Sequence, residues 1–107
     1  MEDLFHKICS LVQEGDVKIS SHGYDELAND QIFIRDVVNT IKEGEVLEEY
    51  PDYPKGPCLL VLQKDNNHLP IHVVWGIPKY ADTPAVLITA YRPDPEKWTG
   101  DFRRRKS

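Results

Sequence analysis

The segments Ile71-His-Val-Val-Trp-Gly-Ile77 and Ala85-Val-Leu-Ile-Thr-Ala-Tyr91 decide the fold of this chain of 107 residues. Both segments are rich in β-branched and aromatic residues, a composition that predicts two strands at the centre of a sheet. The few residues that join them are too short a connection for a parallel crossover. The two segments therefore predict an antiparallel hairpin.

Further strands are predicted before this hairpin. Residues 58–62 are almost wholly apolar and predict a covered strand, and residues 45–50 predict a partly exposed one. Turns rich in proline, glycine or asparagine separate these strands, at residues 51–57 and 64–68. Four strands joined by short turns predict an antiparallel meander. Residues 17–20 alternate briefly between apolar and polar side chains and predict an additional short edge strand.

Helical patterns occupy the N-terminal part of the chain. Apolar residues recur at helical spacing in residues 2–13 and 32–43, and Gly15 and Gly44 are placed to end these two helices. Ser20 or Ser21 can cap a shorter helix over residues 22–28. We therefore predict a single α+β domain over residues 1–107. Two or three N-terminal helices are expected to pack on one face of a small, mostly antiparallel sheet of four to five strands.

The composition is ordinary for a soluble globular domain, with 40% hydrophobic and 29% charged residues. No apolar run approaches the roughly 20 residues that span a bilayer, so no membrane partner is expected. The acidic start Met1-Glu2-Asp3 differs from the basic start of a secretory leader. Cys9 and Cys58 lie far apart, and we expect two reduced thiols in a cytoplasmic protein rather than a disulfide.

The net charge of −5 is unevenly distributed along the chain. Residues 1–95 carry 8 Lys or Arg against 16 Asp or Glu, whereas residues 96–107 carry 5 against 2. The body is therefore acidic and the C-terminal tail is basic. An acidic body repels polyanions, so DNA is not a predicted partner. Trp98 and Phe102 are expected to pack the tail against the body, and residues 103–106 to extend into solvent.

The basic end of the tail allows three interpretations. Arg103, Arg104, Arg105 and Lys106 can contact RNA phosphates, keep the chain soluble, or bind an acidic partner. The acidic strand segment is equally open, because Glu45, Glu48 and Glu49 can form a paired-acid site or simply the solvated edge of a strand.

Four residues carry the candidate chemistry, namely His22, His72, Tyr91 and Arg92. A ribonuclease that works without a metal needs a base for the 2′-hydroxyl, an acid for the leaving 5′-oxygen and a cation for the phosphate. Imidazole, phenol and guanidinium groups at one end of a hairpin can supply all three. We therefore expect these four side chains to gather on a partly open face of the sheet.

Each of these residues also has a structural interpretation. His22 can satisfy the free groups at a helix start, or simply face water. His72 can be a core residue whose ring nitrogens have partners, and Tyr91 can be a core residue with its hydroxyl at the rim. Arg92 can pair with Asp94. Metal and cofactor sites are not predicted, because the four histidines are scattered and no zinc-ligand spacing or phosphate-binding glycine loop is present.

Several segments together resemble a known group of small bacterial proteins. They are Ile19-Ser-Ser-His-Gly23, Gly44-Glu-Val-Leu-Glu-Glu-Tyr-Pro51, Pro70-Ile-His-Val-Val74 and Ile88-Thr-Ala-Tyr-Arg-Pro-Asp-Pro95, followed by Trp98. The series resembles a family that carries a domain of unknown function and is grouped with the RelE/ParE-like toxins, among them RelE itself and the BrnT-type toxins. The resemblance covers about residues 17 to 105 and implies a RelE-like fold.

The resemblance also implies a function, the toxin of a toxin–antitoxin pair. An antitoxin encoded by an adjacent gene is then the expected partner. RelE-type toxins cleave mRNA on the ribosome, which implies RNA or the ribosome as a target and His22, His72, Tyr91 and Arg92 as catalytic positions. The acidic body favours a second hypothesis, a non-catalytic module of the same fold that binds a protein or a ligand. A third is an enzyme that acts on a small molecule at a His/Tyr pocket.

Overall fold

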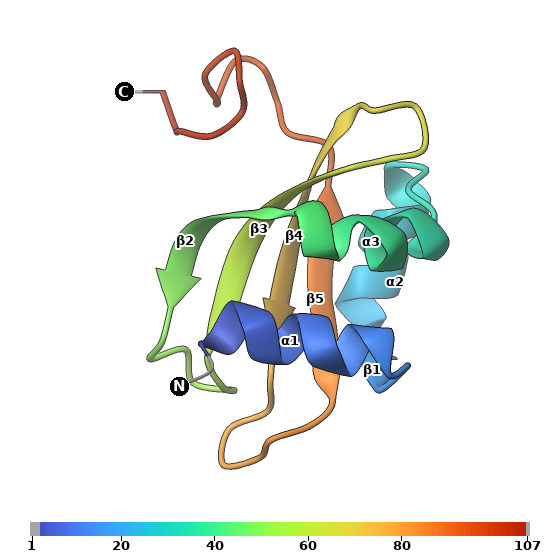
Figure 1. Cartoon of the computed structure of the whole chain (residues 1–107). Helices are drawn as coiled ribbons and strands as arrows, with labels where there is room; N and C mark the ends of the chain where they lie inside the picture. Colours follow the sequence, from blue (N-terminus) through green and yellow to red (C-terminus); the bar gives the residue numbers. More distant parts are fainter. Residues whose placement is uncertain (1–2, 107) are drawn as a thin grey trace.

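The predicted hairpin lies inside a five-stranded sheet in the computed structural model, which describes residues 3–106 (Figure 1). The strand order is β1-β5-β4-β3-β2, with β1 parallel to β5 and the other neighbouring pairs antiparallel. The α+β class is confirmed. In chain order the elements are α1 (Leu4–Gln13), β1 (Val17–Ile19), α2 (Ser21–Asn29), α3 (Ile34–Thr40), the 3₁₀ helix η1 (Ile41–Glu43), β2 (Glu45–Tyr50), β3 (Cys58–Lys64), β4 (Pro70–Gly76) and β5 (Ala85–Tyr91).

The N-terminal helices begin and end close to the positions that the sequence predicts. Asp3 caps α1 by accepting a hydrogen bond from the N–H of His6 at 2.8 Å, and Gly15 ends the following turn at a φ of +78°. Residue 2, which was predicted within this helix, lies outside the described residues. None of the helices in residues 3–106 combines the length and the apolar character that crossing a membrane requires.

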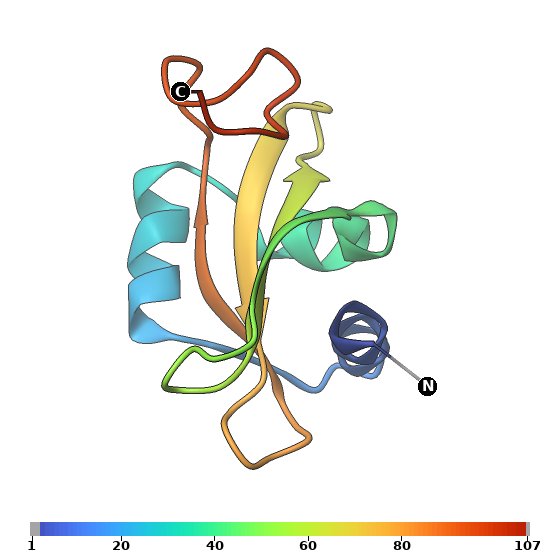
Figure 2. The same cartoon turned by 90° about the vertical axis from the view of Figure 1, so that its left-hand side faces the viewer.

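The hydrophobic core lies on one face of the sheet, under α1 and α3 (Figure 2). Ile8 of α1 and Val37 of α3 are fully buried in the same cluster as Trp75 of β4 and Leu87 of β5. Val73 and Trp75 share this face, as the alternation of a strand predicts. His72 and Val74 therefore point to the other face, which is the face that carries the candidate site.

The prediction that all helices cover one face is wrong for α2. This helix lies along β5, on the opposite side of the sheet from α1 and α3 (Figure 2). Ser20 holds its start against β5, with its N–H donating to the Leu87 carbonyl at 3.0 Å and its hydroxyl to the Ile88 carbonyl at 2.8 Å. A Cβ at Gly23 would lie 2.9 Å from the Leu87 carbonyl oxygen, so glycine allows this close approach. The hydrophobic periodicity of the sequence does not indicate backbone contacts of this kind.

The turn at residues 51–57 folds against the segment that follows β4. The N–H of Lys79 donates to the Lys55 carbonyl at 2.9 Å, and the N–H of Ile77 donates to the Pro57 carbonyl at 3.2 Å. Gly56 lies at the closest approach and has a φ of +134°. A Cβ there would lie 2.1 Å from the Ile77 carbonyl oxygen, so both the backbone conformation and the available space require glycine.

Replacing Gly56 should therefore loosen this turn. We expect Gly56→Ala to lower the free energy of unfolding by about 2 kcal/mol or more, because the methyl group has neither room nor an unstrained φ. Gly100→Ala is the matched control, since nothing lies within 4 Å of a Cβ there and its φ is not positive. Its effect should stay below about 0.5 kcal/mol. Urea unfolding measures both variants, and equal effects would contradict the close approach.

The basic tail folds back over the sheet. Trp98 is buried and forms an isolated β-bridge with Arg105, and the N–H of Thr99 donates to the Arg104 carbonyl at 2.8 Å. The expected packing role of Trp98 is confirmed. The expected extension of residues 103–106 into solvent is wrong for Arg103 and Arg105, because carboxylates of the acidic edge strand β2 bind both guanidinium groups.

Candidate functional site

His72 and Tyr91 lie side by side on the face of the sheet opposite the core. They are directly opposed residues of the neighbouring strands β4 and β5. The Tyr91 hydroxyl is 3.3 Å from Nδ1 of His72, and the two rings meet edge-to-face with their centroids 5.3 Å apart. The antiparallel register of the hairpin thus brings together two of the four residues singled out from the sequence.

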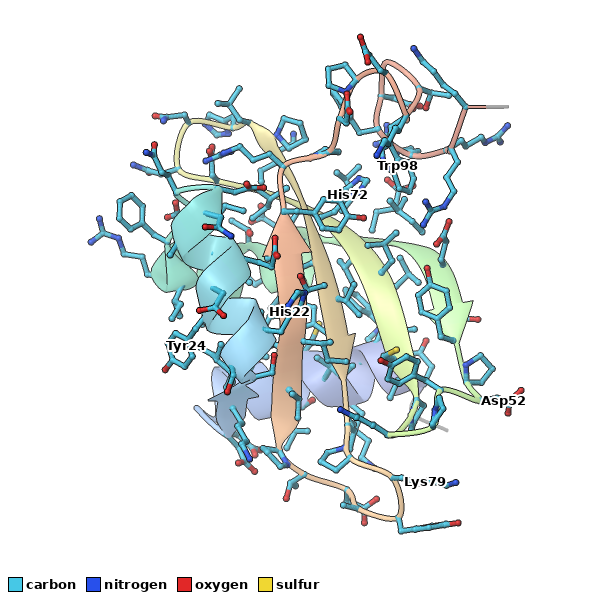
Figure 3. All side chains as sticks on the ribbon, turned by 180° about the vertical axis from the view of Figure 1, so that it is seen from behind. His22, Tyr24, Asp52, His72, Lys79 and Trp98 are labelled. Carbon is cyan, nitrogen blue, oxygen red and sulfur yellow. The ribbon has the colours of Figure 1, made fainter. Side chains whose placement is uncertain are left out.

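The tail covers this pair. The Trp98 indole meets the imidazole edge-to-face at a centroid distance of 4.4 Å, and the two residues lie together in Figure 3. The Phe102 carbonyl accepts a hydrogen bond from Nε2 of His72 at 2.9 Å. Because a carbonyl can only accept, Nε2 carries the proton and Nδ1 accepts from the Tyr91 hydroxyl. His72 is 0% exposed, so both of its nitrogens serve contacts inside the protein.

Burial sets the protonation states of the pair. Burial lowers the pKa of His72 below its ordinary value, and the nearby Arg105 guanidinium lowers this pKa further. The hydrogen bond to the Phe102 carbonyl acts in the opposite direction and raises it. The Glu48 carboxylate also raises the pKa of His72. Burial likewise raises the pKa of Tyr91. Neutral imidazole and neutral phenol are therefore the stable forms at pH 7.

The protein should lose stability as the pH falls from 7.5 to 5.5. The folded state keeps His72 neutral, whereas the unfolded chain, with a histidine pKa of about 6.5, takes up a proton. The stabilisation is complete above about pH 6.5 and is lost as the pH falls from there toward the lowered pKa of the folded state. Urea unfolding at the two pH values measures the loss. His22→Gln should retain it and His72→Gln should reduce it; equal losses in these two variants would contradict the assignment.

Arg92 belongs to a different cluster, at the end of β5. Its guanidinium donates to the Asp65 carboxylate at 2.9 Å and to the Asp30 carbonyl at 3.1 Å. Its backbone N–H donates to the Asp30 carboxylate at 2.7 Å. The pairing with Asp94 that the sequence suggested is therefore replaced by pairing with Asp65. These contacts join β5 to the end of α2 and to the turn between β3 and β4, rather than to His72.

Two basic residues of the tail bind the edge strand β2. Nε of Arg103 donates to the Glu45 carboxylate at 2.6 Å. Arg105 donates to both oxygens of Glu48, at 2.9 and 3.1 Å. The acidic partner that the sequence left open for the tail is thus found within this chain. The remaining basic residue of the arginine run, Arg104, is exposed, as is Lys106.

Glu48 is the centre of this contact. Its carboxylate also accepts a hydrogen bond from the Tyr50 hydroxyl. The Arg105 guanidinium lowers the pKa of Glu48, whereas burial and this carboxylate raise the pKa of Tyr50 to about 12. An ionised, ion-paired Glu48 matches the interpretation of this segment as a strand edge better than a paired-acid site, in which one carboxyl group must hold a proton.

An open cleft lies farther along the same face of the sheet. It has a volume of about 600 Å³ and lies between the first turn of α2 and the turn at residues 51–57, over β4 and β5. We name it the α2 cleft. Its rim includes His22, Tyr53 and Lys55, and its floor includes Ile77, Val86 and Ile88.

His22 borders this cleft, and Figure 3 shows it apart from His72. Its side chain is 66% exposed, with Nε2 3.8 Å from a Glu26 carboxylate oxygen one helical turn on. The expectation that four residues gather in one place is therefore wrong. His72 and Tyr91 form one cluster, Arg92 belongs to a second and His22 to a third, because α2 starts midway along β5 whereas Arg92 follows its end.

Two rim residues of the α2 cleft were not predicted from the sequence. Tyr53 and Lys55 lie in the turn at residues 51–57, where the prolines and the glycine indicate only that the chain reverses. Their proximity to His22 depends on the packing of this turn against the segment after β4. No local pattern in the sequence could have indicated that contact.

The metal-ligating side chains and the two thiols of residues 3–106 are the remaining candidates for chemistry. No group of three or more His, Cys, Asp or Glu side chains in this part of the chain is arranged to hold a metal ion. Cys9 and Cys58 are free thiols, and burial raises the pKa of both. A raised pKa disfavours the reactive thiolate, so both thiols fit a structural role.

Comparison with known proteins identifies one family. Residues 19–92 match the family described as Domain of unknown function (DUF4258). The matched region includes His22, His72, Tyr91 and Arg92 but ends before Trp98, so the tail that covers His72 lies outside it. No curated protein and no solved structure matches the chain.

Proposed function

The chain belongs to the DUF4258 family of domains of unknown function, and from its own geometry we propose that it is a non-catalytic binding module with a RelE-like fold. The observation that carries this proposal is the complete burial of His72, with both ring nitrogens engaged inside the protein. A general acid or base must reach a proton of the substrate. His72, the central catalytic candidate, therefore has a structural role. Arg92, a second candidate, has a structural role as well, because its guanidinium binds Asp65.

The α2 cleft is the recognition surface in this proposal. Its volume of about 600 Å³ lies within the range typical of ligand pockets. An apolar floor with a few polar groups at the rim is also the usual composition of such sites. The side chains of His22 and Lys55 are exposed at this rim and remain accessible to a ligand or a partner protein.

A relation to toxin–antitoxin pairs is part of the same proposal. It rests on the segments around His22, His72 and Tyr91 that resemble RelE-like toxins, and N-terminal helices beside a mostly antiparallel sheet are compatible with it. In this proposal the partner is a protein encoded by an adjacent gene, and the complex forms in the cytoplasm. The acidic body supports a protein or small-ligand partner rather than RNA.

RNA cleavage without a metal is the second candidate function, and the rim of the α2 cleft favours it. His22, Tyr53 and Lys55 bring an imidazole, a phenol and an ammonium group to one open cleft. These are the groups that a base, an acid and a phosphate-binding cation would require. Arg104 and Lys106 would be available for RNA phosphates, whereas Arg103 and Arg105 are bound to β2.

High-level expression in bacteria distinguishes the two candidates. The binding module predicts normal growth and intact RNA, and the product of the neighbouring gene should co-purify with the chain. Lys55→Glu should weaken that complex at least tenfold without changing the melting temperature. Lys79→Glu should leave the complex unchanged, because Lys79 does not line the cleft. Growth arrest with RNA cleavage that His22→Ala abolishes would replace the binding module by the ribonuclease.

A further inference from the structure

We propose that the α2 cleft binds a small molecule that has an apolar body and a single anionic group. This inference rests on the proposed binding function and names the chemical class of a small ligand of the α2 cleft, with which a protein partner bound at the same cleft would compete.

The floor of the cleft requires the apolar body. Ile77 is buried there, while Val86 and Ile88 remain only half-buried in the free protein. Gly76 also lines the cleft, and Ile88 Cδ1 lies only 3.0 Å from the position that a Cβ of Gly76 would take, so the aliphatic side chain packs closely over this glycine. Covering these half-buried aliphatic groups removes apolar surface from water, which is the main favourable contribution to binding. A purely polar ion such as free phosphate would leave them uncovered.

The charge of the rim requires the anionic group. The chain has 18 Asp and Glu residues, yet none of the described residues that line the cleft is acidic. The lining instead contains the Lys55 ammonium and the His22 imidazole. Lys55 has no ion-pair partner within residues 3–106, in contrast to Arg103 and Arg105 on β2. The accessible Lys55 ammonium beside the apolar floor is therefore complementary to a ligand with one negative charge.

The neighbouring groups limit the ligand to one charge. Glu26 lies 3.8 Å from Nε2 of His22, so a carboxylate already approaches that end of the rim. The acidic body repels a polyanion. The first turn of α2 lies at the rim, and its N-terminal dipole adds modestly to the attraction for one anionic group. The walls are preformed, because Ser20 fixes α2 to β5 and the Lys55 carbonyl is bound to Lys79.

Three probes with one apolar body separate these contributions. They are 4-phenylbutyrate, 4-phenylbutanol and 4-phenylbutylamine, with inorganic phosphate as the anion without a body. Titration of the ¹⁵N-labelled full chain by NMR gives the dissociation constants and the location of binding. We expect 4-phenylbutyrate to shift the amides of His22, Gly56 and Gly76, and to bind at least tenfold more tightly than the amine. Phosphate alone should bind at least tenfold more weakly than 4-phenylbutyrate.

Two lysine variants test the source of this preference. Lys55→Gln should weaken 4-phenylbutyrate binding about fivefold to tenfold and leave 4-phenylbutanol unchanged. Lys79→Gln is the matched control, because Lys79 does not line the cleft and its ammonium lies over the Tyr80 ring, 5.1 Å from the ring centroid. This variant should bind like the wild type.

Different failures have different meanings. Equal binding of the acid, the alcohol and the amine in the cleft would overturn the anionic class while leaving the binding function intact. Shifts confined to residues outside the cleft, or no binding of any probe at 10 mM, would overturn the inference. The proposed function itself fails separately, if RNA cleavage depends on His22.

Discussion

Trp98→Ala is expected to lower the free energy of unfolding by about 3 to 4 kcal/mol and to open the His72 imidazole to solvent. Trp98 is only 4% exposed although it belongs to the tail. Its ring packs edge-to-face on His72, and the Arg105 guanidinium lies over the Trp98 ring, 4.8 Å from the centroid. Truncation therefore removes a large buried side chain and an apolar contact that holds residues 96–106 on the sheet.

Urea unfolding and NMR can follow both consequences. Tyr80→Ala is the matched aromatic control, since Tyr80 is 96% exposed and its loss should change stability by less than about 0.5 kcal/mol. The chemical shifts of the His72 ring should move toward those of an exposed histidine in Trp98→Ala alone. A Trp98→Ala protein as stable as Tyr80→Ala would show that the tail does not pack on the sheet in solution.

Arg92→Ala is expected to have the second largest effect, a loss of about 2 to 3 kcal/mol. Asp65 is buried, and its carboxylate also accepts hydrogen bonds from the N–H groups of Asn67 and Leu69 at 2.8 and 2.9 Å. Removal of Arg92 leaves this buried charge without its cation. We place the value below that of a fully buried pair because the Arg92 side chain is 36% exposed.

The pH dependence of this loss identifies its cause. Burial alone would raise the pKa of Asp65, but the Leu69 and Asn67 N–H groups and Arg92 together hold it below its ordinary value. The carboxylate therefore stabilises the fold above about pH 4, and this contribution disappears as the pH falls through the lowered pKa. The difference between wild type and Arg92→Ala should shrink in acid. Arg35→Ala, which removes an exposed guanidinium over the Phe33 ring, is the control; an equal loss in both variants would contradict a role for the Asp65 pair.

The sequence predicts the sheet well because strand signals are local. The composition of β4 and β5 and the short turns between strands specify the meander, and the alternation in β4 places His72 opposite the core. The position of α2 could not be predicted in the same way. It depends on the bonds from Ser20 to β5 carbonyls and on the missing side chain of Gly23, which are tertiary contacts.

The candidate site is predicted less completely than the fold. Neighbouring strands bring His72 and Tyr91 together, and this follows from the hairpin register. The sequence does not show that Trp98 and the Phe102 carbonyl occupy the space above them, since the contact spans about thirty residues of chain. Arg92 could have paired with its near neighbour Asp94, but its guanidinium instead binds Asp65, a buried residue of the turn between β3 and β4. The residue types and their order in the sequence therefore predict a shared site for four residues, of which the structure brings only His72 and Tyr91 together.

The most direct test of the account is to measure how fast each histidine reacts with diethyl pyrocarbonate, with the modified positions located by mass spectrometry. His22 is exposed at the α2 cleft, and His72 is covered by the tail. We predict rapid modification of His22 and protection of His72 in the wild type, with protection of His72 lost in Trp98→Ala. Modification of His72 as fast as His22 in the wild-type protein would contradict the account.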